Sequence, residues 1–353
     1  MAINLATKYE PKLDKRFTTR SLTEAFVGSD YNWEGTNAIK VWTLDAGELN
    51  DYDSTASAYR FGTPTEVDDE MNVYTLKKKR SFSKVFDITH VQDQMFVKKS
   101  SAYLQQMWDE RYVPEIDTYR LAVWANGAGL GKVGSALTKS TIMEEVLMAH
   151  AALDNANVPT ENRVTFIRTD VAVKLKLAAE LGNQQNWVNK ALLQGKIGEV
   201  NGSPVISIPS ARMPAGVEFM VKYKKASADP MKLRMLRAHD SAPGYAGTLM
   251  EGLCRYDAFV LDQKADGIYV YADSTAGLAA PTFSISGNTV TITAPSGATV
   301  KYTTDGTNPK VSATAQTGKS VTITSDTKLR AYAEQTGKTS SAIASYDAVY
   351  TAS

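Results

Sequence analysis

A long amphipathic helical pattern, directly preceded by a charged β-hairpin, is the feature that most constrains how this chain can fold. From Thr89 to about Ala125, apolar residues recur at steps of three, four and seven, the spacing of one helix face. At ~1.5 Å per residue this helix would be about 54 Å long, more than compact domains usually contain. Pro114 interrupts the pattern, so we expect a kink, or two ordinary helices broken there, because proline cannot donate to the preceding turn. The polar residues predicted to form a solvated or interfacial face are Lys98, Lys99, Asp109, Glu110, Arg111 and Asp117.

The residues before the helix alternate between apolar and polar side chains, as β-strands do. Lys40–Leu44, Asn72–Leu76 and Arg80–Phe86 follow this pattern, and Asn50–Glu70 is rich in the Asp, Ser, Gly and Pro of loops. A hairpin of this size cannot bury both faces against its own domain. We therefore expect an arm that lies on another molecule.

Two runs of opposite charge belong to this arm. The acidic run comprises Glu66, Asp68, Asp69 and Glu70, and the basic run comprises Lys77, Lys78, Lys79 and Arg80. A basic run by itself is typical of nucleic-acid binding or of targeting, and more often of a solvated strand edge. Because both signs occur on one projecting arm, we predict that the two runs dock it onto a neighbouring copy of the chain.

Composition narrows the class of protein. The formal net charge is +1, so the chain as a whole has no electrostatic footprint for nucleic acid. Cys254 is the single cysteine, which excludes an internal disulfide framework and favours a small core residue in a reducing compartment. No apolar run approaches the ~18 residues of a membrane span, and Met1–Lys8 lacks the apolar core of a secretory signal. We expect no membrane partner.

The region after the helix alternates helical and strand patterns, without a motif for catalysis or cofactor binding. Gly127–Gly131 is a loop that lacks both GxGxxG and a following GK[ST], so no nucleotide cofactor is expected. His90, His150 and His239 lie far apart without metal-ligand spacing, so we predict no metal site. The predicted elements are a helix over Thr141–Ala156, a strand at Arg163–Ile167, a helix capped by Asp170 and ending at Leu181, and sheet strands at Val200–Ile208, Val217–Tyr223, Gly252–Leu261 and Gly267–Tyr271.

Composition changes near residue 272. Every Trp, Met, His and Cys lies before that point, and the chain after Pro281 is rich in Ser and Thr, with Leu329 as its only leucine. Ala272–Ala280 is small and polar, as linkers are. Alternating runs such as Thr289–Thr293 and Thr299–Thr303, separated by turn signals, predict a small antiparallel β-sandwich.

Several short sequence motifs within residues 12–271 resemble those of a known family. They are Lys15-Arg-Phe-Thr through Leu22-Thr-Glu-Ala-Phe, Tyr59-Arg-Phe-Gly-Thr-Pro-Thr-Glu, Val113-Pro-Glu-Ile-Asp-Thr-Tyr-Arg, Ile197-Gly-Glu-Val-Asn-Gly-Ser-Pro-Val-Ile and Gly252-Leu-Cys-Arg-Tyr-Asp-Ala-Phe-Val-Leu. The order and the sequences of these motifs resemble those of major capsid proteins of tailed bacteriophages, of the Hong Kong ninety-seven type. The resemblance implies an α+β capsid fold, followed here by a small all-β immunoglobulin-like sandwich.

The resemblance also implies a division of the chain and a set of partners. The expected parts are an N-terminal arm (1–37), an extended loop (38–88), peripheral and axial domains (89–272) with a spine helix (89–125), a linker (273–280) and an immunoglobulin-like domain (281–353). Copies of the chain are expected to form hexamers and pentamers of an icosahedral shell around double-stranded DNA. A separate scaffolding protein and a portal are expected partners, with assembly in the host bacterial cytoplasm and a final location in the virion.

The tail resembles a second family. Lys301-Tyr-Thr-Thr-Asp-Gly-Thr-Asn-Pro is similar to a motif of immunoglobulin-like repeats appended to bacterial carbohydrate-active enzymes. We expect the domain to project outward on a short exposed tether, to be dispensable for assembly, and to offer Asp305, Gly306 and Asn308 as an exposed loop for surface glycans. The alternatives are a carbohydrate-active enzyme or a cell-surface adhesin with an accessory sandwich, although no spacing of carboxylates singles out a catalytic pair.

Overall fold

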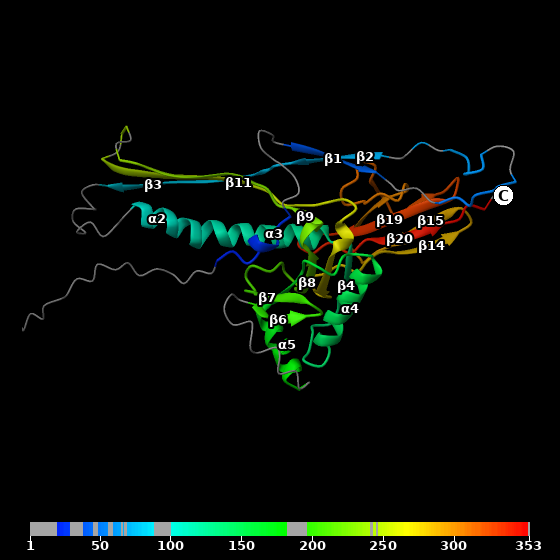
Figure 1. The fold of residues 1–353 in the computed structure, drawn as a ribbon, viewed down its shortest axis with the longest axis horizontal. Coiled ribbons are helices and arrows are strands. Elements are labelled where there is room, and N and C mark those ends of the chain that lie inside the picture. The colour runs from blue at the N-terminus through cyan, green and yellow to red at the C-terminus, as the bar shows by residue number, and fades with distance from the viewer. Residues whose placement is uncertain are drawn as a thin grey trace, which may run out of the picture.

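The computed structural model describes residues 20–28, 38–44, 49–55, 59–64, 66, 69–87, 100–181, 196–240, 243–244 and 246–351. Helices and strands are mixed in an α+β fold, as the sequence predicts. Figure 1 shows one long helix beneath an elongated β-ribbon, a sheet with two further helices below it, and a small β-sandwich that includes the C-terminal end.

The long helix consists of α2 (Ser100–Met107), a π-helical turn (Trp108–Tyr112) and α3 (Val113–Gly127), which follow one another directly. Pro114 lies in the first turn of α3, where its ring would clash with the carbonyl four residues earlier in a regular helix. The wider π turn relieves this clash, and the amide of Val113 bonds to the carbonyl of Trp108, five residues back. Pro114 therefore begins a new segment within one continuous helix, which ends at Gly127 and not at Ala125. Residues 89–99 of the predicted helix lie outside the described residues.

An antiparallel three-stranded sheet packs along this helix. Trp108, Tyr112 and Ile116 of the helix share a buried cluster with Cys254 and Tyr256 of the sheet. Burial raises the pKa of Cys254 to about 11, which keeps it a neutral thiol and agrees with its prediction as a core residue. The strands, in sheet order, are β10 (Met231–His239), β11 (Gly247–Tyr256) and β3 (Lys78–Asp87).

The prediction that Gly252–Leu261 belongs to the central sheet is wrong. Its first half lies in β11, whose two neighbours are β3 and β10. Its second half contains β12 (Phe259–Val260), which pairs only with β9 (Ser227–Ala228) among the described strands. Alternation in the sequence shows that such a segment is extended, but the strand it pairs with depends on residues far away in the chain.

The central sheet is mixed and six-stranded. One face packs on α3 through a cluster containing Leu121, Trp124 and Phe166, and the other face packs on two helices through Leu153 and Leu175. The helices are α4 (Ile142–Asn155) and α5 (Thr169–Leu181). The strands, in sheet order, are β4 (Leu130–Gly134), β13 (Ile268–Asp273), β8 (Val217–Tyr223), β5 (Arg163–Arg168), β7 (Ser203–Ile208) and β6 (Lys196–Val200).

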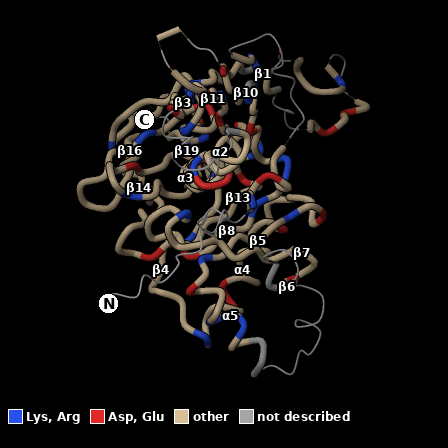
Figure 2. Tube along the Cα trace, turned by 90° about the vertical axis from the view of Figure 1, so that its left-hand side faces the viewer, with Lys and Arg blue, Asp and Glu red and all other residues tan. Residues whose placement is uncertain are grey.

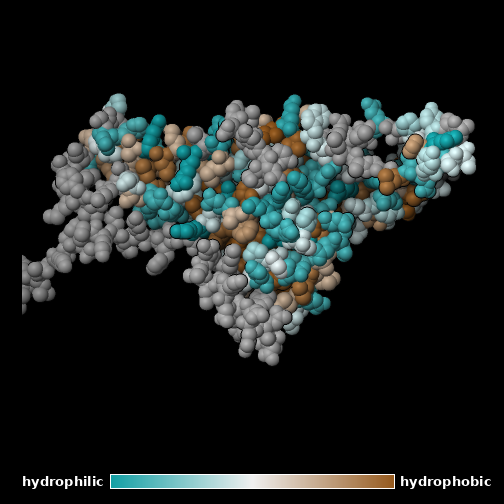
Figure 3. All heavy atoms as spheres, in the orientation of Figure 1, coloured by the Kyte–Doolittle hydropathy of each residue, from teal (hydrophilic) through white to brown (hydrophobic). Residues whose placement is uncertain are grey.

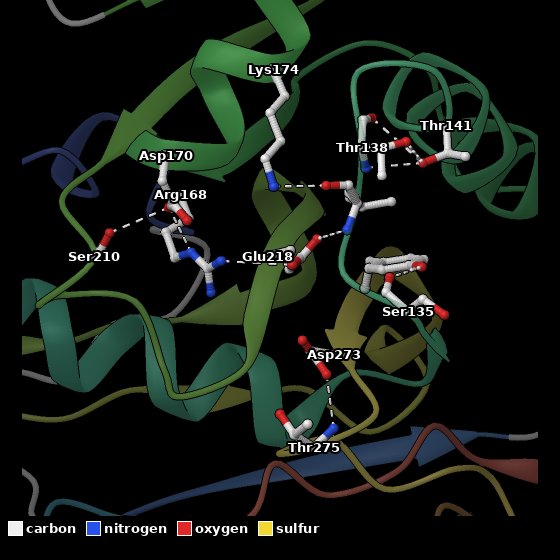
Figure 4. Close-up of polar contacts among 12 residues, drawn as sticks. Ser135, Thr138, Thr141, Arg168, Asp170, Lys174, Ser210, Glu218, Asp273 and Thr275 are labelled. Atoms are coloured by element: carbon white, nitrogen blue, oxygen red, sulfur yellow. Dashed lines mark hydrogen bonds and ion pairs between the residues drawn. The ribbon is translucent and has the colours of Figure 1, made fainter.

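A buried carboxylate ties the loop before α4 to this sheet (Figure 4). Glu218 of β8 accepts a hydrogen bond of 2.8 Å from the amide of Leu137, and Arg168 lies 3.6 Å from its other oxygen. From α5, Lys174 donates to the carbonyl of Leu137 at 2.8 Å. These contacts satisfy a carboxylate that would otherwise be costly to bury. Their role is structural.

Asp170 was predicted to cap α5, but the helix already begins at Thr169. The Asp170 carboxylate lies in the first turn and accepts a 2.7 Å bond from Nε of Arg168. This bond lowers the pKa of Asp170. A carboxylate in the first turn still favours the helix through the backbone amides and the helix dipole.

The C-terminal part is a β-sandwich of two antiparallel sheets, as predicted. Val290, Ile292, Val300, Leu329 and Ala331 are among the residues that fill its core. One sheet contains β14 (Thr282–Ser286), β15 (Thr289–Thr293) and β18 (Ser320–Thr322), and the other contains β17 (Gln316–Thr317), β16 (Thr299–Thr303), β19 (Thr327–Glu334) and β20 (Ala344–Ala348).

The segment 273–280 joins this sandwich to the rest of the chain, but not as the exposed tether that the sequence predicts. Leu278 is 2% exposed and its amide donates to the carbonyl of Thr339 at 3.2 Å. The amide of Ser274 donates to the carbonyl of Gly134 at 2.9 Å. Small residues here permit close packing between two parts of the protein, which composition alone does not distinguish from a flexible linker.

The buried His150 of α4 predicts acid sensitivity. It is 1% exposed, and burial lowers its pKa to about 4, while the pKa in the unfolded chain is ~6.5. The folded state thus binds fewer protons, so stability should fall by up to ~3 kcal/mol as the pH drops from about 6.5 to 4. Denaturant unfolding of the chain and of His150→Asn at both pH values checks this. The variant should lose less stability over that interval, and parallel losses would contradict the prediction.

Candidate assembly surfaces

The N-terminal segment is held on the long helix by one buried carboxylate. Asp117 of α3 is 0% exposed. It accepts hydrogen bonds of 2.7 Å from the hydroxyls of Ser21 and Thr23, and one of 3.1 Å from the amide of Leu22. Arg212 also donates to it at 3.1 Å. Of the two alternatives, a solvated or an interfacial face, the solvated one is wrong for Asp117. Its partners come from a segment almost one hundred residues earlier and from a loop as far beyond.

The next residues of this segment enter the core. Phe26 meets Phe166 of β5 edge to face, with ring centroids 5.8 Å apart. The carbonyl of Phe26 accepts a 2.9 Å bond from Lys222 of β8, whose ammonium also lies 4.3 Å from the ring centre of Trp124. Burial lowers the pKa of Lys222 to about 8. Residues 20–28 are thus fixed to both α3 and the central sheet.

The extended arm contains β1 (Ala38–Leu44) and β2 (Asp69–Thr75), which pair antiparallel with Trp42 opposite Met71. Its two faces differ. On one face, Asn72 and Tyr74 are buried against the chain's own body. On the other, Trp42 is 61% exposed, and Met71 and Val73 are exposed as well.

The loop that connects β1 to β2 also exposes large apolar side chains. Tyr52 and Phe61 contact each other, with ring centroids 5.0 Å apart, yet Phe61 remains 81% exposed. Leu49 and Tyr59 are exposed beside them. Brown, hydrophobic atoms lie open on the upper edge of the molecule where β1 and β2 run (Figure 3). Exposed apolar groups in such number are typical of an interaction surface.

The two charge runs lie at opposite ends of β2. Among the acidic residues, Glu66 is exposed in the loop, Asp69 and Glu70 begin β2, and Asp68 lies outside the described residues. Among the basic residues, Lys77 follows β2, and Lys78, Lys79 and Arg80 begin β3. The structure therefore separates the runs by the length of a strand, about 23 Å for seven residues at ~3.3 Å each.

The basic end of β2 is fastened to the chain's own helix. Arg80 forms an ion pair of 2.6 Å with Glu115 of α3, and Lys78 lies 4.8 Å from the ring centre of Tyr119. Lys78, Glu115, Tyr119 and Arg212 are among the residues that line a groove of about 730 Å³ beside α3. Elsewhere, positive and negative residues are interspersed over the described part of the chain (Figure 2).

In the C-terminal domain, the predicted exposed loop is only partly exposed. Asp305 is exposed and accepts bonds of 2.6 Å from Thr307 and 2.7 Å from Thr314, and Gly306 is half-buried. Asn308 is 1% exposed, which corrects the prediction. Its amide donates to the carbonyl of Asp262 at 3.1 Å, so it serves a contact between domains and cannot face a ligand.

The described residues contain no group of three or more His, Cys, Asp or Glu side chains placed to hold a metal ion. Within the same residues, no helix is both long enough and apolar enough to cross a membrane. The features that stand out are instead the anchored N-terminal segment and the two-faced arm.

Solved phage structures share this fold over about three quarters of the chain. The capsid structure of cyanophage P-SCSP1u matches with a TM-score of 0.63 at 13% identity, covering 77% of this chain and 93% of that one. A structure from Mycobacterium phage Che8 matches with a TM-score of 0.61 at 16% identity, covering 76% and 98%. The mature capsid of bacteriophage PhiM1 matches with a TM-score of 0.58 at 13% identity, covering 77% and 92%. The chain therefore has the phage capsid fold.

The C-terminal domain has its own match. Residues 278–345 match the family of chitobiase/beta-hexosaminidase C-terminal domains. No curated protein matches the chain. The phage capsid fold is thus followed by an additional immunoglobulin-like domain, as the two resemblances in the sequence predict.

Replacing Asp117 should release the N-terminal segment. Asp117→Ala removes the carboxylate that accepts hydrogen bonds from Ser21, Leu22 and Thr23, and it leaves the Arg212 guanidinium without its partner. We therefore expect the free energy of unfolding to fall by ~3–5 kcal/mol. Proteolysis within residues 20–28 should accelerate. Denaturant unfolding and timed digestion measure both effects. Asp109→Ala is the control, because Asp109 accepts bonds from Gln105 of the same helix. Equal effects of the two variants would contradict the anchoring role.

Proposed function

We propose that this chain is a structural subunit of a phage capsid, which assembles with copies of itself into a closed shell. The observation that carries the proposal is the arm, which buries one face on its own subunit and leaves Trp42, Met71 and Val73 open on the other. Its phage capsid fold supports the same conclusion. A second copy of the chain is the occupant that we propose for the open face.

The charges of the arm suggest how the copies meet. The acidic run lies at the distal end of β2 and the basic run at its root, so the distal end of one arm can meet the root of the next. The groove beside α3 offers Lys78 to such an acidic segment, while Arg212 in the same groove is already paired with Asp117. Arg80 already pairs with Glu115 of its own chain. It therefore contributes to docking by holding the basic end of the arm in place.

The finer features of the particle are also part of the proposal. We propose that the subunits form pentamers at the fivefold vertices of an icosahedral shell and hexamers between them, and that the interior holds double-stranded DNA by nonspecific contact. We propose an outward position for the C-terminal domain, since its strands β14 and β15 expose Ser and Thr hydroxyls suited to solvent and to weak multivalent glycan contacts. A symmetric reconstruction of purified particles tests these features, and a sandwich density on the inner surface would contradict the outward position.

The open face of the arm should be needed for assembly but not for folding. Trp42→Ala and Met71→Ala remove exposed groups, so subunit stability should change by less than ~0.5 kcal/mol. Because each arm would lose a contact worth ~1.4 kcal/mol or more, the subunit concentration needed for shells should rise at least about tenfold. Negative-stain microscopy across a concentration series measures this shift.

A variant in another exposed apolar residue provides the control. Val349→Ser alters a side chain that is 67% exposed in the C-terminal domain, and its assembly threshold should match that of the unchanged chain. Normal shells from Trp42→Ala and Met71→Ala at the original threshold would refute the role of the arm. Failure of the unchanged chain to form any shell, both alone and together with its expected scaffolding protein, would refute the proposed function itself.

The charge runs predict a salt-dependent defect. Replacing both Lys78 and Lys79 with Glu should weaken assembly more at low salt than at high salt, because exposed charges are screened within a Debye length of ~8–10 Å. The charge-matched control replaces Lys139 and Lys319, which are both exposed and lie outside the arm, with Glu. Light scattering during assembly at two salt concentrations gives the comparison. Mixing the reversed subunits with subunits carrying Glu66→Lys should restore part of the low-salt assembly, and an equal defect at both salts would exclude docking by these charges.

A further inference from the structure

The C-terminal domain closes the end of the long helix with a lysine side chain. Nζ of Lys310 donates to the carbonyls of Asn126 at 2.8 Å and of Ala128 at 2.7 Å, and it lies 5.3 Å from the ring centre of Tyr332. The last carbonyls of a helix lack partners within the helix and carry partial negative charge, so a cation is the complementary group there. Lys310 thus joins the sandwich to the end of α3.

Further bonds hold the same two parts together. The hydroxyl of Ser340 donates to the carbonyl of Asn126 at 2.8 Å, and its amide donates to the Asn126 side chain at 3.0 Å. The amide of Ile343 donates to the carbonyl of Gly129 at 2.9 Å. With Lys310, these bonds come from two separate loops of the sandwich. Contacts from two loops prevent rotation about a single point.

The C-terminal domain also reaches the root of the arm. Val311 packs into the cluster formed by Tyr74 of β2 with Leu261 and Phe259 of the body. The rings of Tyr74 and Phe259 are 5.4 Å apart. The residue that follows the helix-capping Lys310 therefore packs against a cluster to which the arm contributes Tyr74.

Asp262 connects the arm and the domain a second time. Its carboxylate accepts a 3.5 Å bond from Asn72 of β2, and its backbone carbonyl accepts the 3.1 Å bond from Asn308 of the C-terminal domain. All three residues are buried. The loop that contains Asp262 is held from both sides, so its position depends on both the arm and the sandwich.

We propose that the C-terminal domain is a brace that clamps the root of the extended arm against the end of the long helix, and so sets the direction in which the arm leaves the subunit. This inference rests on the proposed function, because the arm's direction matters where the arm docks onto another subunit. It replaces the expectation of a dispensable knob on an exposed tether. Lys310 and Val311 are positioning residues of this brace.

Hydrogen exchange of the full-length, unassembled chain tests the brace directly. Lys310→Met combined with Val311→Ala removes the helix-capping cation and the methyl groups that pack against the cluster containing Tyr74. Amide exchange in residues 72–75 of β2 should accelerate about tenfold, since local opening would no longer require breaking these contacts. Lys319→Met, a matched change at an exposed site of the same domain, should leave the exchange unchanged.

Exchange in the sandwich core reports whether the domain remains folded. The amides of β15 and β19 should remain protected from exchange in the double variant. Val311→Ala alone, which keeps Lys310, should accelerate amide exchange in β2 about threefold while the sandwich core stays protected. Unchanged exchange of β2 in the double variant would overturn the brace, whether or not the sandwich stays folded. If amide exchange in β2 accelerated in the double variant but not in Val311→Ala, the supporting role of Val311 would be contradicted.

Assembly separates this inference from the proposed function. The double variant should form particles of irregular diameter at concentrations where the unchanged chain forms uniform shells. Uniform shells from the double variant would contradict the brace and leave the capsid function standing. An unchanged chain that forms no shells even with its expected scaffolding protein would contradict the capsid function, while the exchange measurement would still decide whether the sandwich clamps the arm.

Discussion

The burial of α3 between two sheets is the constraint on which the rest of this structure depends. One end of the helix packs through Ile116 on the three-stranded sheet, and the other packs through Leu121 and Trp124 on the central sheet. A helix whose apolar stripe faces one sheet needs only one partner, whereas α3 buries residues against two sheets and also buries the polar Asp117 and Arg120. The positions of both sheets are therefore set by one element.

Because α3 is enclosed, its polar groups must be satisfied by other parts of the chain. Asp117 is bonded by the N-terminal segment, and the last carbonyls of the helix are bonded by Lys310 of the C-terminal domain. Buried polar groups without partners are costly, so each acts as a specific attachment point for one segment. Apolar packing would hold those segments less specifically, since it tolerates small shifts.

The arm shows the opposite situation. Its inner face is bonded through Asn72 and packed through Tyr74, while Trp42 on the outer face finds no cover within the described part of its own subunit. A two-stranded ribbon is only marginally stable alone, so its root needs support before its open face can be presented in one direction. The C-terminal domain supplies such support, because Val311 packs against the cluster that contains Tyr74 of the arm.

Periodicity and composition were enough to locate the helix from Ser100 onward, the strands β1, β2 and β3 and the C-terminal sandwich, because these depend on local repeats of 3.6 or 2 residues. They did not show that β3, which was expected in the arm, pairs with β11 instead. Motif-level resemblance added the capsid fold. The sequence did not reveal that Asp117 is buried, that Gly252–Leu261 leaves the central sheet, or that Asn308 faces another domain. Each of these depends on a partner far away in the chain. The amino-acid pattern by itself thus determined which segments are helical or extended and which surfaces are apolar, and only the tertiary structure decided which polar groups meet, because hydrogen-bond partners are chosen in three dimensions after the elements have packed.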